Sequence, residues 1–318
     1  MLCGKTGSLQ LYQSTAWADR LLELFGDEPV YLAICRDEEP ILFLVGFKQG
    51  RRPAVGTGLR RLRAVVRNLL PAGQSFSWYG EPVATDSADA DAYRLLGDSI
   101  SMHLREKGLR LTGGQWPVRY ADSLPSHWQS RRWATLKVDL SPDTTTILSR
   151  FKPAARKEIR KAEARGIEVR MVRNEEELRI YGDEAVRCAA RYGKTNVSTR
   201  DFLSMWKHFR RPGFVFETFS ASIDGKFLAG LSIWGTRATV GELGSFQTQY
   251  AHDQKLSGPD LIKWRALEWA KDAGIATFDL AGINPCPKNP KEENIRRFKE
   301  KWGGQYEEYL MVQCGRQR

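Results

Sequence analysis

The sequence is poor in the residues that build metal centres and disulfide frameworks. Its 318 residues include only five cysteines and four histidines. The cysteines are scattered, odd in number and never spaced as Cys-x-x-Cys, which argues against a disulfide framework and a zinc knuckle. The histidines lie far apart and lack the His-Glu-x-x-His spacing of a zinc helix. We therefore expect no metal centre, and we expect the thiols to be reduced.

Long apolar runs are also absent. No segment approaches the roughly 18 uncharged apolar residues that a membrane span needs, and residues 1–11 hold no basic cluster followed by an apolar stretch. The sequence therefore predicts a cytoplasmic protein without a transmembrane segment, with a monomer as the favoured state. With 42% hydrophobic and 11% aromatic residues, a chain of this length can build two domains with cores of ordinary size.

Acidic residues are outnumbered, with 38 Asp and Glu against 49 Lys and Arg. Two segments account for the formal net charge of +11. Lys48 to Arg67 contain seven basic and no acidic residues, and Arg150 to Arg173 contain nine basic and three acidic ones. Such concentrations favour a polyanionic partner, such as RNA, a phosphorylated carrier or an anionic membrane surface. Solvated helix faces explain them equally well.

One supersecondary unit occurs twice in the sequence. Val30 to Phe47 and Phe214 to Trp234 each hold two apolar runs separated by a polar turn, which predicts two hairpins. Later in the chain, each hairpin is followed by a helix that ends at a glycine and then by a strand. The first helix and strand are predicted over Tyr93–Lys107 and Leu109–Thr112, and the second over Leu261–Ala273 and Thr277–Leu280.

This order of elements predicts the fold class. Strands followed by a helix and another strand indicate a mixed α/β (α+β) sheet, and the duplication indicates two related domains, each a twisted mixed sheet flanked by helices. We place the boundary near Ser141, so that residues 1–140 form the first domain and residues 141–318 the second. A final strand, at about 306–318, can pack back on the first domain. The cleft between domains is then the favoured functional site.

The chain also resembles a known family. Part of the resemblance lies in the basic segment, where Phe151, Arg156, Ile159, Arg160, Lys161, Ala162, Gly166, Ile167 and Val169 resemble the start of the second domain in Fem-type transferases, which build peptide bridges from aminoacyl-tRNA. Trp78 to Pro82 resembles a fragment of the first domain. The most specific match follows that family's C-terminal pattern in order: Tyr250, Leu256, Pro259, Leu261, Ile262, Trp264, Ala270, Gly274, Asp279, Gly282, Phe298, Lys299, Gly303 and Gly304.

The resemblance, which spans most of the chain, implies a pair of acetyltransferase-like (GNAT) domains. It also implies amide formation, in which an amine attacks the ester or thioester of an activated acyl group. Two family features are missing. No acetyltransferase phosphate loop precedes Leu261, where the chain has Gln254 to Pro259, and no charged helical hairpin interrupts the second domain. The resemblance therefore implies a compact member without a coiled-coil arm, and the first departure argues against coenzyme A in the second domain.

Candidate catalytic residues come from the same C-terminal pattern. A fixed cation beside the oxyanion that forms during amine attack lowers the barrier. The resemblance places Lys299 near the ester and terminal phosphate of the donor, with Phe298 shaping the pocket. Asp279, at a strand end, is a candidate to receive a proton or to orient the amine. Lys299 can also be read as one more charge on a basic helix, and Asp279 as the cap of a turn.

Candidate substrate-binding residues come from both domains. The resemblance places Tyr250 in the acceptor site, where a phenol can hydrogen-bond a phosphate or a carboxylate. It also implies that Trp78, Tyr79 and Glu81 border the acceptor cleft. A place in the core is the alternative for Tyr250 and for Trp78.

A third candidate segment follows the helix predicted over Glu184 to Ala190. Arg191 and Tyr192 lie there, and an arginine can hold an anionic acceptor through a forked pair of hydrogen bonds. A plain surface position is the alternative. Cys286, between two prolines, has no visible activating partner, so we favour direct transfer over a covalent intermediate.

These observations predict an aminoacyltransferase that moves an aminoacyl group directly from aminoacyl-tRNA to an amine acceptor, either a peptidoglycan precursor or a small metabolite, with no further cofactor. The residues predicted to contact the RNA are Lys152, Arg156, Arg160, Arg60 and Arg63. One alternative is an N-acyltransferase that uses acyl-coenzyme A and acts on a sugar or a cell-surface precursor. Another is a catalytically inert RNA-binding module, although the RNP and KH signatures are absent.

Overall fold

The computed structural model describes residues 10–49, 74–194 and 197–315. The chain forms two compact units, the first made of Met1–Trp133 with Glu308–Arg318 and the second of Ala134–Glu307. Most of the basic segment Lys48 to Arg67 lies outside the described residues, including Arg60 and Arg63. Within the described ranges, no helix has the length and apolar character needed to cross a membrane.

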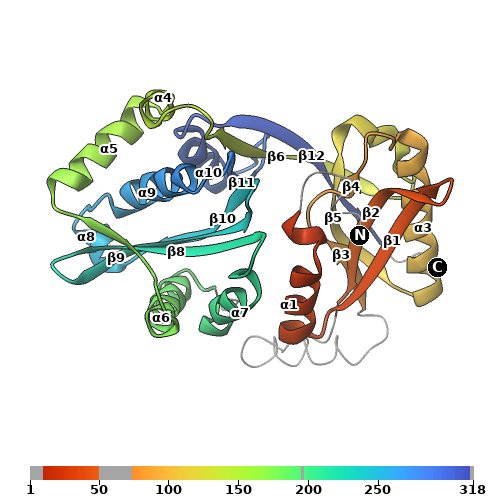
Figure 1. Ribbon diagram of the computed structural model, residues 1–318, viewed down its shortest axis with the longest axis horizontal. Coiled ribbons are helices and arrows are strands. Elements are labelled where there is room, and N and C mark those ends of the chain that lie inside the picture. The colour runs from red at the N-terminus through yellow and green to blue at the C-terminus, as the bar shows by residue number, and fades with distance from the viewer. Residues whose placement is uncertain (1–9, 50–73, 195–196, 316–318) are drawn as a thin grey trace. The chain divides into compact units, whose positions relative to one another are not determined.

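The first unit is a mixed sheet with α1 and α3 (Figure 1). Its strands follow the order β1-β2-β3-β5-β12, and β4 pairs with β2. The β3–β5 pair is parallel and the other pairs are antiparallel. The elements are two short 3₁₀ turns at Leu11–Gln13 and Val118–Ser123, α1 (Thr15–Phe25), β1 (Glu28–Arg36), β2 (Glu39–Lys48), β3 (Ser75–Trp78), β4 (Val83–Ala84), α3 (Ala90–Lys107), β5 (Arg110–Pro117) and β12 (Gln305–Cys314), which begins in the second unit.

The second unit is a six-stranded sheet in the order β6-β11-β10-β9-β8-β7. Figure 1 shows α5 and α9 on one face of this sheet and α6 and α7 on the other. Its elements are β6 (Gln129–Asp139), which begins in the first unit, α4 (Thr144–Ser149), α5 (Pro153–Ala164), β7 (Glu168–Met171), α6 (Glu175–Arg191), α7 (Thr199–Phe209), β8 (Phe214–Ile223), β9 (Lys226–Thr236), β10 (Thr239–Gln247), α8 (Gln249–Asp253), α9 (Gly258–Asp272), β11 (Thr277–Ile283) and α10 (Pro290–Glu300).

The predicted repeat is confirmed, and further strands belong to each copy. In the first unit, the hairpin β1-β2 is followed by β3, by α3 and by β5, which is parallel to β3. In the second unit, the hairpin β8-β9 is followed by β10, by α9 and by β11, which is parallel to β10. An antiparallel strand then flanks each parallel pair, β12 beside β5 and β6 beside β11. The predicted mixed α/β fold with two related sheets is therefore correct.

The parallel pair of the second unit separates after three residue pairs. Thr239 to Gly241 of β10 face Thr277 to Asp279 of β11. Beyond Glu242 the pairing of β10 with β9 shifts in register, and beyond Asp279 the pairing of β11 with β6 also shifts. Ala281 has a φ of 64° at the second irregularity, and bulges of this kind re-aim side chains. The strands therefore part at Glu242 and Asp279.

The basic helix α5 is packed into the core of the second unit through a narrow apolar face. Ala155, Ile159 and Ala162 are buried in the core of the second unit. The adjacent Ala154 is exposed, so the inward face of the helix is narrow. The apolar partners come from α9, which supplies Leu261, Trp264 and four other buried members of the same core. A packed helix presents its charges from a fixed backbone.

Two glycines in the left-handed region allow the cost of a close contact to be measured. Gly303 has a φ of 69°, and a Cβ there would lie 2.6 Å from the carbonyl oxygen of Arg150. Gly274 has a φ of 75° and no atom within 4 Å of such a Cβ. We expect Gly274→Ala to cost about 1–2 kcal/mol of unfolding free energy, from backbone strain alone.

Gly303→Ala carries the same strain and must also displace the Arg150 carbonyl, which adds about 1–3 kcal/mol. Urea unfolding of the two variants beside the wild type checks this difference. Equal losses in the two variants would show that the backbone around Arg150 yields freely.

Candidate active site

Lys299 lies in the last turn of α10, beside the separation of β10 and β11. The helix begins at Asn289, whose side-chain oxygen accepts a hydrogen bond from the backbone N–H of Glu292 (3.0 Å). At its other end, the half-buried ammonium of Lys299 donates to the carbonyl oxygen of Gly282 in β11 (3.0 Å). Burial lowers the pKa of Lys299, and the neighbouring Lys263 adds to the effect, whereas Glu242 and Asp279 oppose it. The lysine is therefore a fixed charge and not a free surface side chain.

A buried ion pair lies within electrostatic reach of Lys299. Lys263 of α9 is 2% exposed, and its ammonium contacts the carboxylate of Glu242 in β10. Burial alone would raise the pKa of Glu242, but the charge and hydrogen bond of Lys263, aided by Lys299, hold it below its usual range. A buried charge without a partner is strongly destabilising, so each member of the pair requires the other.

Asp279 completes the cluster from β11. Its Oδ1 atom accepts hydrogen bonds from the hydroxyl of Thr135 and from the backbone N–H of Ala281, the latter at 2.7 Å. Burial raises the pKa of Asp279, and these two hydrogen bonds oppose the rise. The carboxylate thus caps the turn at Ala281, as the alternative interpretation proposed, and it also interacts electrostatically with Lys137 and Lys299. A capping role for Asp279 is therefore compatible with the catalytic role predicted for its carboxylate.

Sequence reasoning missed Glu242 and Lys263. One signal was present: Lys263 interrupts an apolar run on α9 in which Leu261, Ile262 and Trp264 are all buried. A lysine at such a position requires a buried partner. Glu242 itself carries no local signal, because it lies 21 residues upstream on a strand.

Phe298 is half-buried in the last turn of α10, next to Lys299. The ammonium of Lys301 lies 4.1 Å from the centroid of its ring. Lys301 in turn contacts the carboxylate of Asp260 on α9. Lys301, which lies over the ring of Phe298, therefore ties the end of α10 to the beginning of α9.

Arg191, Tyr192 and Tyr250 form a second group in this unit. Arg191 donates to the side-chain oxygen of Gln249 (2.7 Å) and to the carbonyl of Gln247, which links the end of α6 to the beginning of α8. Tyr250 is 40% exposed and Tyr192 is 72% exposed. The core position considered for Tyr250 is therefore wrong, and both rings are available at the surface.

The first-unit candidates lie in different environments. Trp78 is 3% exposed, and its indole N–H donates to the carbonyl of Gln115 (3.0 Å), so it is a core residue. Tyr79 is half-buried, stacks on Tyr12 and meets Trp17 edge-on. Glu81 is half-buried near Tyr93 and contributes, after burial, to raising the pKa of that phenol to about 12.

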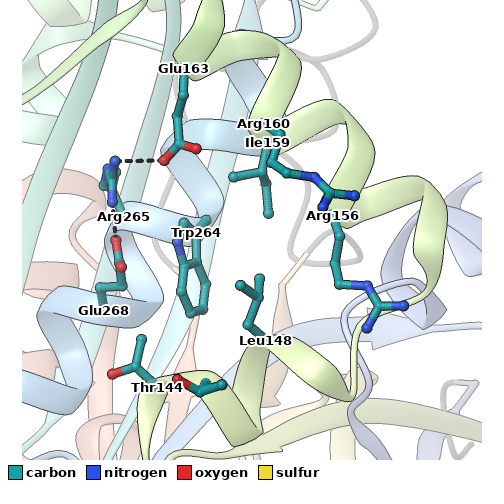
Figure 2. A pocket seen from close by; sticks show the side chains of 10 residues that line it. Thr144, Leu148, Arg156, Ile159, Arg160, Glu163, Trp264, Arg265 and Glu268 are labelled. Atoms are coloured by element: carbon teal, nitrogen blue, oxygen red, sulfur yellow. Dashed lines mark hydrogen bonds and ion pairs between the residues drawn. The ribbon is translucent and has the colours of Figure 1, made fainter.

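The described basic candidates lie at and along α5. Lys152 precedes the helix, and its ammonium lies 3.5 Å from the carboxylate of Glu300. Arg156 donates to the carbonyl of Ser149 (3.1 Å). Together with Arg160, it lines a pocket of the second unit (Figure 2).

Comparisons with known proteins agree with the fold. Residues 149–299 match the family described as Acetyltransferase (GNAT) domain. No curated protein matches the chain. Among solved structures, FemX has a TM-score of 0.70 at 14% identity over 94% of this chain and 91% of that one.

Two further structures show the same fold. L-PGS from Bacillus licheniformis has a TM-score of 0.58 at 12% identity, over 98% of this chain and 95% of that one. A tandem GNAT protein from the clavulanic acid biosynthesis pathway has a TM-score of 0.52 at 10% identity, over 98% and 99%. The resemblance to Fem-type proteins is thus confirmed at the level of the fold, which is a tandem pair of GNAT-like units.

The charge cluster makes a testable prediction about Lys299. Replacing Glu242 by Gln removes the larger of the two anionic interactions that raise the pKa of Lys299, and Asp279→Asn removes the smaller. We expect both variants to lower the pKa of Lys299, and Glu242→Gln to lower it further. Isotope-labelled methylation of the lysines, followed by NMR titration, measures this pKa, with Lys299→Arg to assign the signal.

Glu293→Gln is the matched control, because Glu293 lies on the same helix but pairs with Arg297. It should leave the pKa of Lys299 unchanged. An unchanged pKa in both cluster variants would show that the two carboxylates do not act on Lys299.

Proposed function

We propose that the protein is an amide-forming transferase that moves an aminoacyl group from aminoacyl-tRNA to an amine acceptor, either a peptidoglycan precursor or a small metabolite. The observation that carries the proposal is the half-buried ammonium of Lys299, held beside two carboxylates where β10 and β11 separate. A GNAT match over this part of the chain supports acyl transfer, and the sequence resemblance to Fem-type transferases supports an aminoacyl donor.

Lys299 suits the oxyanion of this reaction. When the amine attacks the ester carbonyl, a C–N bond forms and the carbonyl oxygen becomes negative. An ammonium has three N–H donors, and Lys299 gives one of them to Gly282. The remaining donors are available to the oxyanion, and a cation fixed in a partly dry site stabilises it without reorganisation.

Asp279 is suited to the proton transfer that the reaction requires. The attacking amine loses a proton as the C–N bond forms, and the ester oxygen of the ribose needs one as its C–O bond breaks. A carboxylate whose pKa is raised by burial can accept the first proton and return it to the leaving oxygen. The amide and the free ribose hydroxyl are then the products, with no oxidant or metal required.

The donor preference is supported by charge. Lys152 lies at the beginning of α5, and Arg156 and Arg160 lie along it. Contacts between basic side chains and phosphates supply much of the affinity of RNA-binding proteins. Lys152 also connects α5 to the site, because its backbone N–H donates to the carbonyl of Lys301 (2.9 Å). In this proposal, the RNA lies along α5 and its aminoacyl ester reaches Lys299.

The alternative donor, acyl-coenzyme A, is favoured by the tandem GNAT relative. Against it, the beginning of α9 is already in contact with an internal anion. Ser257 donates its hydroxyl to the carboxylate of Glu158 on α5, and this hydrogen bond is the main cause of a lowered pKa for Glu158. A phosphate at the same helix end would have to displace that carboxylate, which also repels it.

The donor class is tested by following labelled amino acid from charged tRNA into an amine acceptor. We expect ribonuclease treatment of the tRNA to abolish transfer, and calorimetry to detect no binding of coenzyme A. Transfer that survives ribonuclease, or coenzyme A binding with activity on acyl-coenzyme A, would favour the alternative.

The role of Lys299 is tested by Lys299→Met, which keeps the length of the side chain and removes its charge. Loss of one oxyanion donor costs about 10²–10³-fold in kcat. The matched control is Lys291→Met, an exposed lysine on the same helix, which should stay within about twofold of the wild type because surface substitutions have small effects. Equal rates for the two variants would remove Lys299 from the mechanism.

A further inference from the structure

A pocket of about 300 Å³ lies among α4, α5 and α9 of the second unit (Figure 2). This volume is at the lower end of the range of small-molecule sites. The pocket shares no lining residue with the Lys299 cluster. Its lining combines apolar, basic and acidic side chains.

The inner wall of the pocket is apolar and preformed. Leu148, Ile159 and Trp264 come from three different helices, and Figure 2 shows their side chains between the charged groups of the two flanks. Ile159 is 3% exposed and Trp264 is 4% exposed. The indole of Trp264 is held by a perpendicular contact with Phe151, at a centroid distance of 5.4 Å. Such a wall suits a flat apolar body.

One flank of the pocket is cationic. Arg156 and Arg160 are one turn apart on α5, and Figure 2 shows both guanidinium groups on the same side. Arg156 gives one N–H to the carbonyl of Ser149. Within the described part of the chain, neither guanidinium is paired with a carboxylate. Two neighbouring arginines with spare donors match a phosphate.

The opposite flank is acidic. Arg265 lies between Glu163, at 2.8 Å, and Glu268, at 2.6 Å, and Figure 2 marks both contacts. Two carboxylates share one guanidinium, so the flank keeps a negative charge and unused acceptor lone pairs. It therefore favours an amino group on the ligand and disfavours a carbonyl oxygen.

We propose that this pocket binds a nucleotide whose base carries an exocyclic amino group, cytosine or adenine. The phosphate contacts Arg156 and Arg160, the base lies against Leu148, Ile159 and Trp264, and the amino group donates to Glu163 or Glu268. Uracil presents a carbonyl oxygen where cytosine has its amino group, so the acidic flank disfavours it. The source of the nucleotide is the one part of this inference that rests on the proposed function. If the donor is aminoacyl-tRNA, the nucleotide is an unpaired residue of that tRNA.

Calorimetry with cytidine monophosphate, uridine monophosphate and cytidine tests the pocket. We expect the cytidine nucleotide to bind the wild type about tenfold more tightly than the uridine nucleotide, which corresponds to one hydrogen bond to a charged group. Arg160→Met should weaken the cytidine nucleotide about tenfold and leave cytidine itself unaffected, because only the nucleotide carries the phosphate.

Lys157→Met is the matched control. Lys157 is an exposed lysine on the same helix that does not line the pocket, and its loss should change binding less than about twofold. No saturable binding of cytidine monophosphate, equal binding of the two nucleotides, or equal losses in Arg160→Met and Lys157→Met would overturn the inference. Unchanged thermal unfolding of both variants shows that neither affects the fold.

The source of the nucleotide is tested by adding single-stranded oligocytidylate. Tighter binding than the mononucleotide supports an RNA ligand, and equal binding supports a free nucleotide in the same pocket. Because no transfer is measured, the two proposals fail separately. Binding of cytidine monophosphate without transfer of an amino acid would support the pocket proposal and contradict the proposed function. Transfer without binding of cytidine monophosphate would support the proposed function and contradict the pocket proposal.

Discussion

The ion pair between Glu242 and Lys263 is the contact on which the candidate site depends. It joins β10 to α9 in the interior of the second unit. An apolar pair of similar volume is often as stable as a buried ion pair, or more so, so stability alone does not explain these charges. Their effect on Lys299 does provide an explanation. Glu242 raises the pKa of Lys299 against the effect of burial, and Lys263, which lowers that pKa, holds Glu242 in its charged form.

The internal repeat shows how the two units differ at corresponding positions. In each, a parallel pair of strands separates after three residue pairs, with Ser77 facing Gly113 in the first unit and Gly241 facing Asp279 in the second. The next residue is Trp78 in the first unit and Glu242 in the second. A Cβ on Gly114 would lie 2.1 Å from the indole of Trp78, so the indole fills the space over that glycine. The first unit therefore has a core aromatic where the second has a charge.

Local sequence patterns were sufficient for the fold but only partly for the site. Hairpins and glycine-terminated helices are set by short-range periodicity, and both hairpins and both helices were predicted close to their observed bounds. The strands β3 and β10 were not predicted, and the strand predicted over Leu109–Thr112 covers only the first part of β5. Lys299 and Asp279 were selected through the ordered C-terminal pattern, and the structure brings the two together in the candidate site. Glu242 was not, because its importance comes from a partner on another element. Trp78 was selected as a substrate contact from its neighbours in sequence, and only tertiary packing shows that its ring is enclosed.

The second unit also fixes its basic helix relative to Lys299. The ring of Phe151, just before α5, meets that of Trp302, just after α10, at a centroid distance of 5.2 Å. The backbone of Lys152 bonds that of Lys301 at the same junction. Gly303 packs against Arg150, where a side chain would require the Arg150 carbonyl to shift. In the proposed reaction, a donor lying along α5 is positioned relative to Lys299 by these packed contacts within one unit. Such positioning accounts for several kcal/mol of a barrier when it replaces a bimolecular encounter, so the proposed direct transfer relies mainly on this alignment and on one stabilising charge.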